Sequence, residues 1–520
     1  MAAVRREIER KYESGTGRLP DLTGVGPVAA VADRGTVALD AAYYDTADER
    51  LAAAGLTLRR RTGGTDAGWH LKIPVAPDVR DEIQAPLSDE VPPALAALLR
   101  SRVRGAALRP VLRLRSTRAV RHLLDARGTL LAELSVDTVR ADRPAGTTAA
   151  ADDHGGHDDR SATARWTEIE VELAEGGDPA LLDLLDARLR AAGVRRSAAP
   201  SKAARALAAT APPGHRPPPP PAPPAPPVTA GDHVLARLRA QRDIVVALDP
   251  AVRRDLPDSV HRMRVATRRL RSALRTHGRV LDRAATAPLA AELKWLAGEL
   301  GLDRDHEVLA ERLTAALDAL PETLVTGPVR TRLRLWSASR RAGARSRVVA
   351  VLDGGRYLAL LDALDALTAR PPLRPAAGGD PAEVLGRALG EEHARLAAAL
   401  DRALALPPGP ARDLALHEAR KQAKRTRYAA ETAAGALGAA AGPPGADAKA
   451  LQTLLGDHQD GVLARRALRE LAGQAQAARE SSFTYGLLYG REEHRAAVLE
   501  AGLPRLRAGL RPFGTGRGAG

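Results

Sequence analysis

The chain has 520 residues, too many for one ordinary domain, and its length predicts about two to four. Its formal net charge of +15 favours polyanionic partners such as phosphate chains, nucleic acid or an acidic membrane. The absence of cysteine excludes disulfides, thiolate metal sites and cysteine nucleophiles. The charged start lacks an apolar segment, and no apolar run reaches about 18 residues, so we expect a cytoplasmic protein without a membrane span.

The first 210 residues show the alternation of charged and apolar side chains that is typical of strands. A period of two places the two sets on opposite faces of a sheet. We therefore expect the apolar set to pack outward against helices or other strands, and the charged set to face a shared, hydrated space. Helical patterns at about 90–104 and 178–210 supply covering helices. The alternation recurs in six segments, around 7–11, 58–61, 71–73, 112–115, 133–137 and 168–172.

The charged face has the composition of a site for a metal-bound phosphate chain. Carboxylates lie on the first and last long strands, and cations lie on the strands between them. Carboxylate oxygens suit Mg²⁺ or Mn²⁺, and arginine forks suit phosphate oxygens. The alternative is a solvated face with cross-strand ion pairs. It is less favoured because six segments share the same pattern. The charged residues on this face include Glu7, Glu9, Lys11, Arg59, Arg61, Lys72, Arg80, Arg113, Arg115, Glu168, Glu170 and Glu172.

Seven short motifs in this half resemble the CYTH domain, also called the triphosphate tunnel metalloenzyme. They are EIERK from 7, YYDT from 43, LTLRRR from 56, WHLK from 69, ELSVDTV from 133, EIEVEL from 168 and SK from 201. The resemblance covers about residues 1–210. It implies an eight-stranded antiparallel β-barrel around a charged tunnel, with flanking helices. It also implies hydrolysis of triphosphate substrates or, in some members, cyclisation of ATP.

The same resemblance implies a role for each matching residue. Glu7, Glu9 and Lys11 form the catalytic motif. The ligands of the divalent cations, Mg²⁺ or Mn²⁺, are Glu7, Glu9, Glu168 and Glu170, with Asp137 helping to hold a second ion. Phosphates are bound by Lys11, Arg59, Arg61, Lys72, Arg113 and Lys202, and Arg115 and Arg118 compete with Arg113 for one phosphate position.

A proline-rich segment, APPGHRPPPPPAPPAPP from 211, separates the two halves of the chain. Proline fixes φ and lacks a backbone donor, so we expect a polyproline II spacer of about 50 Å when fully extended. A docking site for a proline-binding module is the alternative. The predicted domains are therefore 1–210 and 229–520, joined by a linker at 211–228. A polar loop at 144–160 explains His154 and His157 better than a metal site does.

The second half has helical spacing throughout and contains an internal repeat. HRMRVATRRLRSALR from 261 matches HEARKQAKRTRYAAE from 417. The repeat predicts two similar helical bundles related by a pseudo-twofold axis. Intervals of three, four and three place each basic row on one helix face, where like charges destabilise the helix unless an anion binds. A solvated arginine face and metal binding by the histidines are the alternatives. The rows are His261, Arg264, Arg268 and Arg271, and His417, Arg420, Lys424 and Arg427.

These rows, with Lys421, resemble the CHAD domain, the conserved-histidine α-helical domain, over about 229–520. The resemblance implies an all-α double bundle whose basic groove binds inorganic polyphosphate. We therefore expect a cytoplasmic, metal-dependent triphosphatase of inorganic triphosphate or short polyphosphate, associated with polyphosphate granules. A non-catalytic polyphosphate-binding protein, ATP cyclisation and thiamine triphosphate hydrolysis are the alternatives. Aromatic residues make up only 2% of the chain, which disfavours nucleic-acid binding by base stacking.

Overall fold

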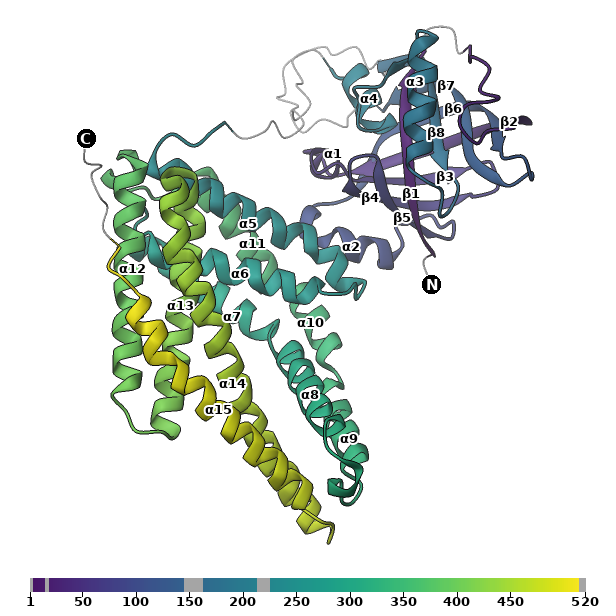
Figure 1. Ribbon diagram of the computed structural model, residues 1–520. Coiled ribbons are helices and arrows are strands. Elements are labelled where there is room, and N and C mark those ends of the chain that lie inside the picture. The colour runs from purple at the N-terminus through teal and green to yellow at the C-terminus, as the bar shows by residue number, and fades with distance from the viewer. Residues whose placement is uncertain (1–2, 15–17, 145–161, 213–224, 514–520) are drawn as a thin grey trace. The chain divides into compact units, whose positions relative to one another are not determined.

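The computed structural model describes residues 3–14, 18–144, 162–212 and 225–513, apart from the side chains of 302–305 and 341. His154, His157, most of the proline-rich segment and the C-terminal residues from 514 lie outside the described residues. The chain divides into two compact units, Met1–Pro223 and Pro224–Gly520 (Figure 1). The finer domain limits at 210 and 229 stay predictions. No helix in the described ranges is long and apolar enough to cross a membrane.

The strands of the first unit form a closed antiparallel ring. The sheet order is β5-β4-β3-β2-β6-β7-β8-β1, and the ring closes because β1 also pairs with β5. The two-residue strand β9 (Arg195–Arg196) pairs with the end of β1. The predicted eight-stranded antiparallel barrel is thus confirmed. Its strands are β1 (Ala3–Glu13), β2 (Ala30–Asp45), β3 (Thr57–Thr62), β4 (Gly68–Ala76), β5 (Val79–Ala85), β6 (Arg109–Leu124), β7 (Leu130–Arg143) and β8 (Ala162–Leu173).

Helices cover the ring where its alternation presents apolar side chains. Helix α3 (Ala180–Ala191) packs on apolar residues of β1, β7 and β8, and α2 (Pro93–Val103) packs on those of β3, β4 and β5. The four-residue helix α1 (Arg50–Ala53) joins the second cluster through Leu51. The fourth helix, α4 (Lys202–Ala209), packs its alanines and Leu207 on apolar residues of β2, β6 and β7. The first residues of α4 also line the space inside the ring, so α4 covers part of the inward face.

The second unit is entirely helical in the part that the structure describes, as predicted. One core joins α5, α6, α7 and α11 with parts of α12 and α13. A second core contains residues of α12, α13, α14 and α15, and a third contains residues of α8, α9, α14 and α15 (Figure 1). The helices are α5 (Ala230–Arg253), α6 (Ser259–Thr276), α7 (Arg283–Glu299), α8 (Leu302–Asp318), α9 (Val329–Arg341), α10 (Ala344–Asp353), α11 (Gly355–Ala369), α12 (Pro381–Leu404), α13 (Pro410–Leu437), α14 (Gly442–Ala477) and α15 (Phe483–Gly509).

A buried histidine follows α6 and makes the stability of the helical unit depend on pH. His277 is 2% exposed, and neither ring nitrogen has a hydrogen-bond partner among the described residues. Burial lowers the pKa of His277 to about 4, because the low-dielectric core disfavours the charged imidazolium. The folded unit therefore holds this ring neutral at pH values where an unfolded histidine already binds a proton.

We predict that His277→Leu makes the helical unit less sensitive to acid. Above the unfolded pKa of about 6.5 the ring is neutral in both states, and as the pH falls from there to about 4 the unfolded chain binds a proton that the folded unit does not, so stability is lost across that range. A shift of this size corresponds to roughly 3 kcal/mol. Urea unfolding followed by circular dichroism at pH 7 and pH 4 measures it. An equal loss of stability in wild type, His277→Leu and the exposed control His494→Gln would contradict the prediction.

Candidate functional site

The ring encloses a cavity of about 610 Å³, lined by side chains from all eight strands and from the start of α4. Its walls are mostly charged, with cations and carboxylates interleaved. The alternation expected from the sequence therefore does point charged side chains into one shared space. The predicted residues that the cavity brings together are Glu7, Glu9, Lys11, Arg59, Arg61, Lys72, Glu170 and Lys202.

A cluster of three carboxylates lies beside this cavity. Asp137 faces Glu168 across the β7–β8 pairing, and Lys11 faces Glu170 across the β1–β8 pairing. Oxygens of Asp137, Glu168 and Glu170 lie within 4.8 Å of one another. The ammonium of Lys202 contacts all three, at 3.1 Å from Glu168 and 2.7 Å from Glu170. Like charges on neighbouring strands repel, so this cluster requires a cation among its oxygens.

Two carboxylates of this cluster, Asp137 and Glu170, and the nearby Glu9 have lowered pKa values. Burial opposes ionisation of Glu9, but the charges of Lys11 and Lys72 outweigh it and lower the pKa of Glu9 to about 2. The pKa values of Asp137 and Glu170 are also lowered, because nearby lysine and arginine charges outweigh burial. These carboxylates are therefore ionised at neutral pH, the state in which they bind a metal ion.

Two other carboxylates on the cavity wall have raised pKa values. Burial, and then the charge of Glu7, raises the pKa of Glu172 to about 7. Burial likewise raises the pKa of Glu7, although Lys72 lies 2.5 Å away. A carboxyl that titrates near pH 7 exchanges a proton readily under physiological conditions. Glu172 thus differs in kind from Glu170, its neighbour on the same face of β8.

The three-carboxylate cluster beside the cavity fits a hard divalent cation. The donors of the three-carboxylate cluster are all oxygens, all are buried, and they offer the short separations that one ion needs. Glu9 belongs to the same network, because Lys11 lies 2.9 Å from Glu9 and 3.1 Å from Glu170. Glu7, in contrast, pairs with Lys72.

Sequence reasoning missed Glu82, a carboxylate that orients the cations opposite. Its Oε1 lies 3.0 Å from Nδ1 of His70, 3.4 Å from Arg59 and 3.8 Å from Lys72. Burial opposes its ionisation, but His70 and Lys72 outweigh this and lower the pKa of Glu82. A signal was present in the sequence, since Arg80, Glu82 and Gln84 alternate along β5 and all line the cavity.

Arg113 and Arg115 do not line the cavity, in contrast to their predicted role. Their side chains are half exposed and pair with Asp40, at 2.6 Å and 3.6 Å. Arg118 points inward instead, where it makes a two-pronged contact with Asp137, each bond 2.8 Å long. The reason is the period of two: Leu112 and Leu114 share the face of Arg118 and pack against α4, which leaves positions 113 and 115 outside.

In the helical unit, arginines from both sequence repeats meet at one cavity. A space of about 640 Å³ lies between α6, α7, α12 and α13. Burial, and then the charges of Arg275, Arg425 and Arg268, lower the pKa of Arg271, and burial and Arg275 lower that of Arg425. These groups therefore repel one another. The charged side chains that line this basic cavity are Arg271, Arg275, Arg283, Lys294, Glu392, Arg395 and Arg425.

Other residues of the two predicted rows lie elsewhere. Arg427 contacts Glu431 at 3.3 Å and lies over the ring of Tyr428, where Arg269 of the other repeat also converges. Lys421 pairs with Glu418 at 2.6 Å. The structure thus brings Arg271 of the predicted set to the basic cavity, and it adds Arg275 and Arg425 to it.

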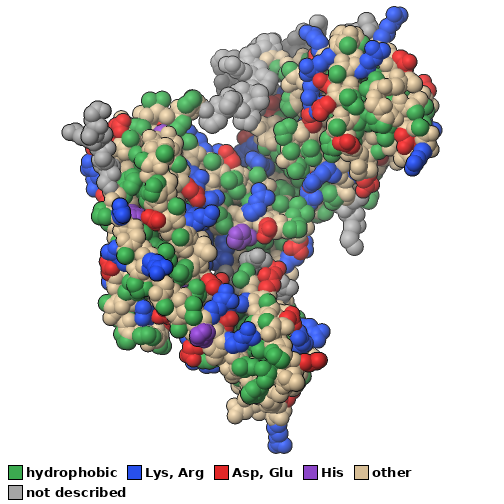
Figure 2. Space-filling view, in the orientation of Figure 1, with side chains coloured by type: hydrophobic (Ala, Val, Ile, Leu, Met, Phe, Trp, Pro, Cys, Tyr) green, Lys and Arg blue, Asp and Glu red, His purple; other side chains and the backbone are tan. Residues whose placement is uncertain are grey.

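The remaining members of the rows lie along the same two helices. His261 is exposed, His417 and Arg268 are partly exposed, and Lys424 is 8% exposed. Arg264 and Arg420 pack against matching glycines. An added Cβ would come within 2.7 Å of Arg264 at Gly301 and within 3.5 Å of Arg420 at Gly456. This correspondence supports the internal repeat. On the face drawn in Figure 2, basic side chains are spread among acidic and apolar ones and form no continuous patch.

A closed β-ring with a charged tunnel and a separate helical unit with a basic cavity define a two-domain α+β protein. The family model described as "CYTH domain" matches residues 5–207, and that described as "CHAD domain" matches residues 236–469. The chain is 40% identical over 519 residues, 97% of each chain, to "Uncharacterized protein MT2285" and "Uncharacterized protein Rv2226" of two Mycobacterium tuberculosis strains. It belongs to the family of proteins that join a CYTH domain to a CHAD domain.

Two solved structures are similar to parts of the chain. "Crystal structure of the CHAD domain from the plant Ricinus communis" covers 55% of this chain and 94% of that chain, at 26% identity and a TM-score of 0.44. "Putative adenylyl cyclase HpAC1 from Hippeastrum reveals a dominant triphophatase activity" covers 42% of this chain and 100% of that chain, at 18% identity and a TM-score of 0.24. CYTH tunnel enzymes as a class use divalent metals and act as hydrolases or cyclases.

We predict that Lys202→Met destabilises the first unit and that Mn²⁺ restores more stability to the variant than it adds to the wild type. The substitution leaves three close carboxylates short of a cation, and removing one partner of a buried ionic network costs about 3 kcal/mol. Urea unfolding with EDTA or with Mn²⁺ measures both effects. The control Arg115→Met removes an exposed cation and should behave as wild type. Equal Mn²⁺ stabilisation of all three proteins would contradict a metal role for the cluster.

Proposed function

We propose that the first unit hydrolyses inorganic triphosphate or short polyphosphate with Mg²⁺ or Mn²⁺, and that the helical unit binds polyphosphate. The observation that carries the proposal is the tunnel, where ionised carboxylates and buried cations face one enclosed space. Such a space suits a ligand that carries both signs of charge, and a metal-bound phosphate chain is one. The membership of the chain in a CYTH and CHAD family supports the same assignment.

The carboxylates of the tunnel hold the metal ions in this proposal. Asp137, Glu168 and Glu170 form one set of ligands, with Glu9 beside them. When bound, a divalent cation neutralises the phosphate chain and polarises the phosphorus–oxygen bond that breaks. The sheet already holds these ligands, and Lys202 and Arg118 must release the carboxylate oxygens that the cation takes.

The cations of the tunnel hold the phosphates. Arg59, Arg61, Lys72 and Arg118 surround the same space and offer forked or point contacts to non-bridging oxygens. Water attacks a phosphorus atom and the bridging phosphorus–oxygen bond breaks. The products are inorganic phosphate and the shortened chain. The attacking water loses a proton, and Glu172, whose pKa is about 7, is the carboxyl on the wall best matched to accept it.

An inorganic substrate fits the tunnel wall better than a nucleotide or thiamine triphosphate. Tyr43 is the one aromatic side chain among the described residues that line the cavity. A base or thiazolium ring usually needs a stacking surface, whereas a phosphate chain needs the charges that dominate here. The composition of the wall therefore favours tripolyphosphate over ATP.

We predict that the full chain releases phosphate from tripolyphosphate only when Mg²⁺ or Mn²⁺ is present, and that Glu9→Gln lowers kcat at least 100-fold. The substitution removes one negative charge from the metal-binding network but keeps the size of the side chain. A phosphate-release assay over tripolyphosphate, long polyphosphate, ATP and thiamine triphosphate, with and without EDTA, makes the measurement. Turnover in EDTA, or full activity of Glu9→Gln, would overturn the proposed hydrolase.

A matched pair of arginine variants in the same assay tests the geometry of the tunnel. Arg118→Ala removes an inward cation and should lower kcat/KM at least tenfold. Arg113→Ala removes an outward cation from the same strand and should leave kcat/KM within twofold of wild type. If both variants lost activity equally, the general charge of the unit would matter and the inward position of Arg118 would not.

The basic cavity is the proposed anchor of the polyphosphate chain in the helical unit. Burial, and then the charge of Arg275, lowers the pKa values of Arg271 and Arg425, so an anion between these side chains relieves repulsion. Along α6 and α13, the rows add the exposed or partly exposed side chains of His261, Arg264, Arg268, His417 and Arg420, whereas Lys424 is buried and Lys421 and Arg427 pair with glutamates. A flexible chain that touches both helices gains from their effective concentration.

We predict that Arg271→Gln/Arg425→Gln weakens long-chain polyphosphate binding at least tenfold without lowering the stability of the helical unit. The double substitution removes two phosphate contacts and also removes repulsion between like charges. Affinity should fall with salt less steeply than in wild type, because fewer counterions are released. Fluorescence titration at two salt concentrations, in the Glu9→Gln background to prevent hydrolysis, gives both quantities.

A control pair separates this cavity from the general basic surface. Arg347→Gln/Arg387→Gln makes the same change in net charge at two exposed arginines and should bind polyphosphate as wild type does. Duplex DNA should bind more weakly than polyphosphate, because a stiff helix follows a narrow cavity poorly. Equal losses in the two double variants, or equal affinity for DNA, would show an ordinary solvated surface.

A further inference from the structure

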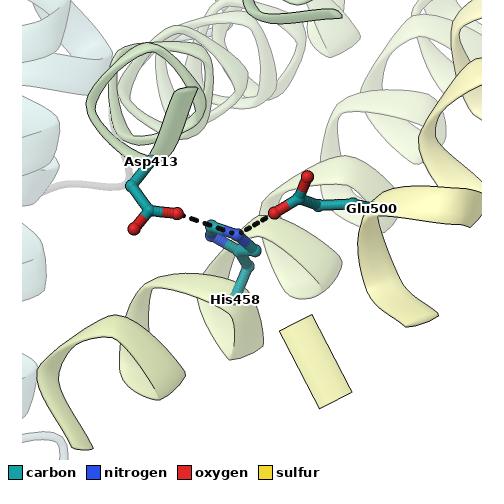
Figure 3. Close-up of side chains that lie close together, drawn as sticks. All are labelled: Asp413, His458 and Glu500. Carbon is teal, nitrogen blue, oxygen red and sulfur yellow. Dashed lines mark hydrogen bonds and ion pairs between the residues drawn. The ribbon is translucent and has the colours of Figure 1, made fainter. Parts of the chain in front are cut away.

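The last three α-helices of the chain bring a histidine between two carboxylates. Asp413 lies in the first turn of α13, His458 lies in the middle of α14, and Glu500 lies near the end of α15 (Figure 3). The imidazole Nε2 is 3.0 Å from Oε1 of Glu500 and 3.5 Å from Oδ1 of Asp413. His458 is 2% exposed, and the carboxylate side chains are 19% and 13% exposed.

One nitrogen faces two carboxylate oxygens in this cluster, and one proton does not serve both well. If Nε2 donates to Glu500, the longer contact to Asp413 is left without a donor from the ring. A metal ion satisfies both contacts at once. Zn²⁺ binds nitrogen and oxygen ligands at about 2.0–2.2 Å, which places neighbouring ligand atoms roughly 3.0–3.5 Å apart. The two measured separations fall in that range.

Each carboxylate is also fixed from outside the cluster. Nη2 of Arg465 lies 3.1 Å from Oδ2 of Asp413, and Nε of Arg412 lies 3.1 Å from Oε2 of Glu500. The two arginines thus contact the outer oxygens, and the inner oxygens face the imidazole. Hydrogen bonds of this kind orient metal-binding carboxylates, and they also reduce the negative charge of the cluster. We therefore expect an affinity weaker than that of a structural zinc finger.

The geometry points to a divalent transition-metal site at Asp413, His458 and Glu500 that joins α13, α14 and α15. The ligand set of one imidazole and two carboxylates suits Zn²⁺ or Mn²⁺ better than Mg²⁺, which prefers oxygen ligands and water. The site is independent of the proposed tunnel chemistry, because it lies in the helical unit and shares no residue with the tunnel. Three protein ligands leave at least one position of a tetrahedral ion open to water or to a phosphate oxygen.

The test uses the full chain, stripped with EDTA and titrated with Zn²⁺ in excess Mg²⁺, which fills the oxygen-lined tunnel. Bound zinc is counted by elemental analysis and its affinity is measured by calorimetry. We expect His458→Gln to bind one equivalent of Zn²⁺ fewer than wild type and Glu500→Gln to bind it at least tenfold more weakly. The control His494→Gln removes an exposed histidine from the helix that carries Glu500 and should bind as wild type does.

Zinc should also raise the unfolding temperature of the helical unit in wild type and in His494→Gln, with no rise in His458→Gln. Polyphosphate binding and circular dichroism show whether each variant folds. If His458→Gln does not fold, the zinc affinity of Glu500→Gln alone tests the site. Equal zinc content in wild type, His458→Gln and Glu500→Gln would overturn the site. A wild type that binds no zinc would also overturn the site, since the cluster would then be a hydrogen-bonded histidine between two carboxylates.

Discussion

The need to balance buried charge governs the first unit. A closed ring has an inside, and period-two alternation fills that inside with ionisable groups whose burial without partners would be prohibitive. The structure meets this need by pairing almost every inward group with one of opposite sign, as when Lys202 lies among Asp137, Glu168 and Glu170. The same pairing holds Arg59 and Lys72 in place through Glu82. The ring fold and its charged lining therefore depend on each other.

This balance also explains how the proposed substrate enters without a large electrostatic cost. A metal-bound phosphate chain brings positive charge to the carboxylates and negative charge to the cations. Lys202, Arg118 and Lys11 then exchange carboxylate partners for phosphate oxygens, and the net charge of the cavity changes little. Glu172 stands apart because burial and Glu7 leave it with a pKa near 7, the value suited to proton transfer. The network that stabilises the ring is thus also prepared for its ligand.

How far the sequence predicts this structure differs from one element to the next. Alternation along β1 and β8 predicted the inward Glu9, Lys11 and Glu170 correctly, because apolar neighbours such as Ile169 pack against an outer helix. On β6 the rule gave the wrong face for Arg113. There α4 covers part of the inner surface, so Leu112 and Leu114 are the inward residues, and the charged residues beside them point out. The phase of the alternation depends on a helix that comes 90 residues later in the chain, and no local pattern contains it.

Contacts between distant segments account for the other misses. The sequence shows the two basic rows of the helical unit as a repeat, but it does not show where each side chain lies or what it contacts. Arg427 contacts Tyr428 and Glu431 near Arg269. Arg425 lies two residues earlier, on nearly the opposite face of α13, and joins Arg271 in the cavity. Asp413, His458 and Glu500 have no common motif at all and meet only because three helices pack together.

The two units apply electrostatics in opposite ways, and this suggests how they work together. The charges of the tunnel are paired internally, so the proposed substrate must replace existing ion pairs, and a ligand that carries a metal ion can do this for both signs of charge. The basic cavity instead keeps Arg271, Arg275 and Arg425 in mutual repulsion, so any flexible polyanion that reaches it lowers the energy. In the proposed function, a cavity of this kind would capture long chains with little dependence on the metal, whereas the tunnel would admit the metal-bound chain end. The proposed capture and the proposed hydrolysis would then respond differently to salt and to divalent cations, because the two units place their counter-charges differently.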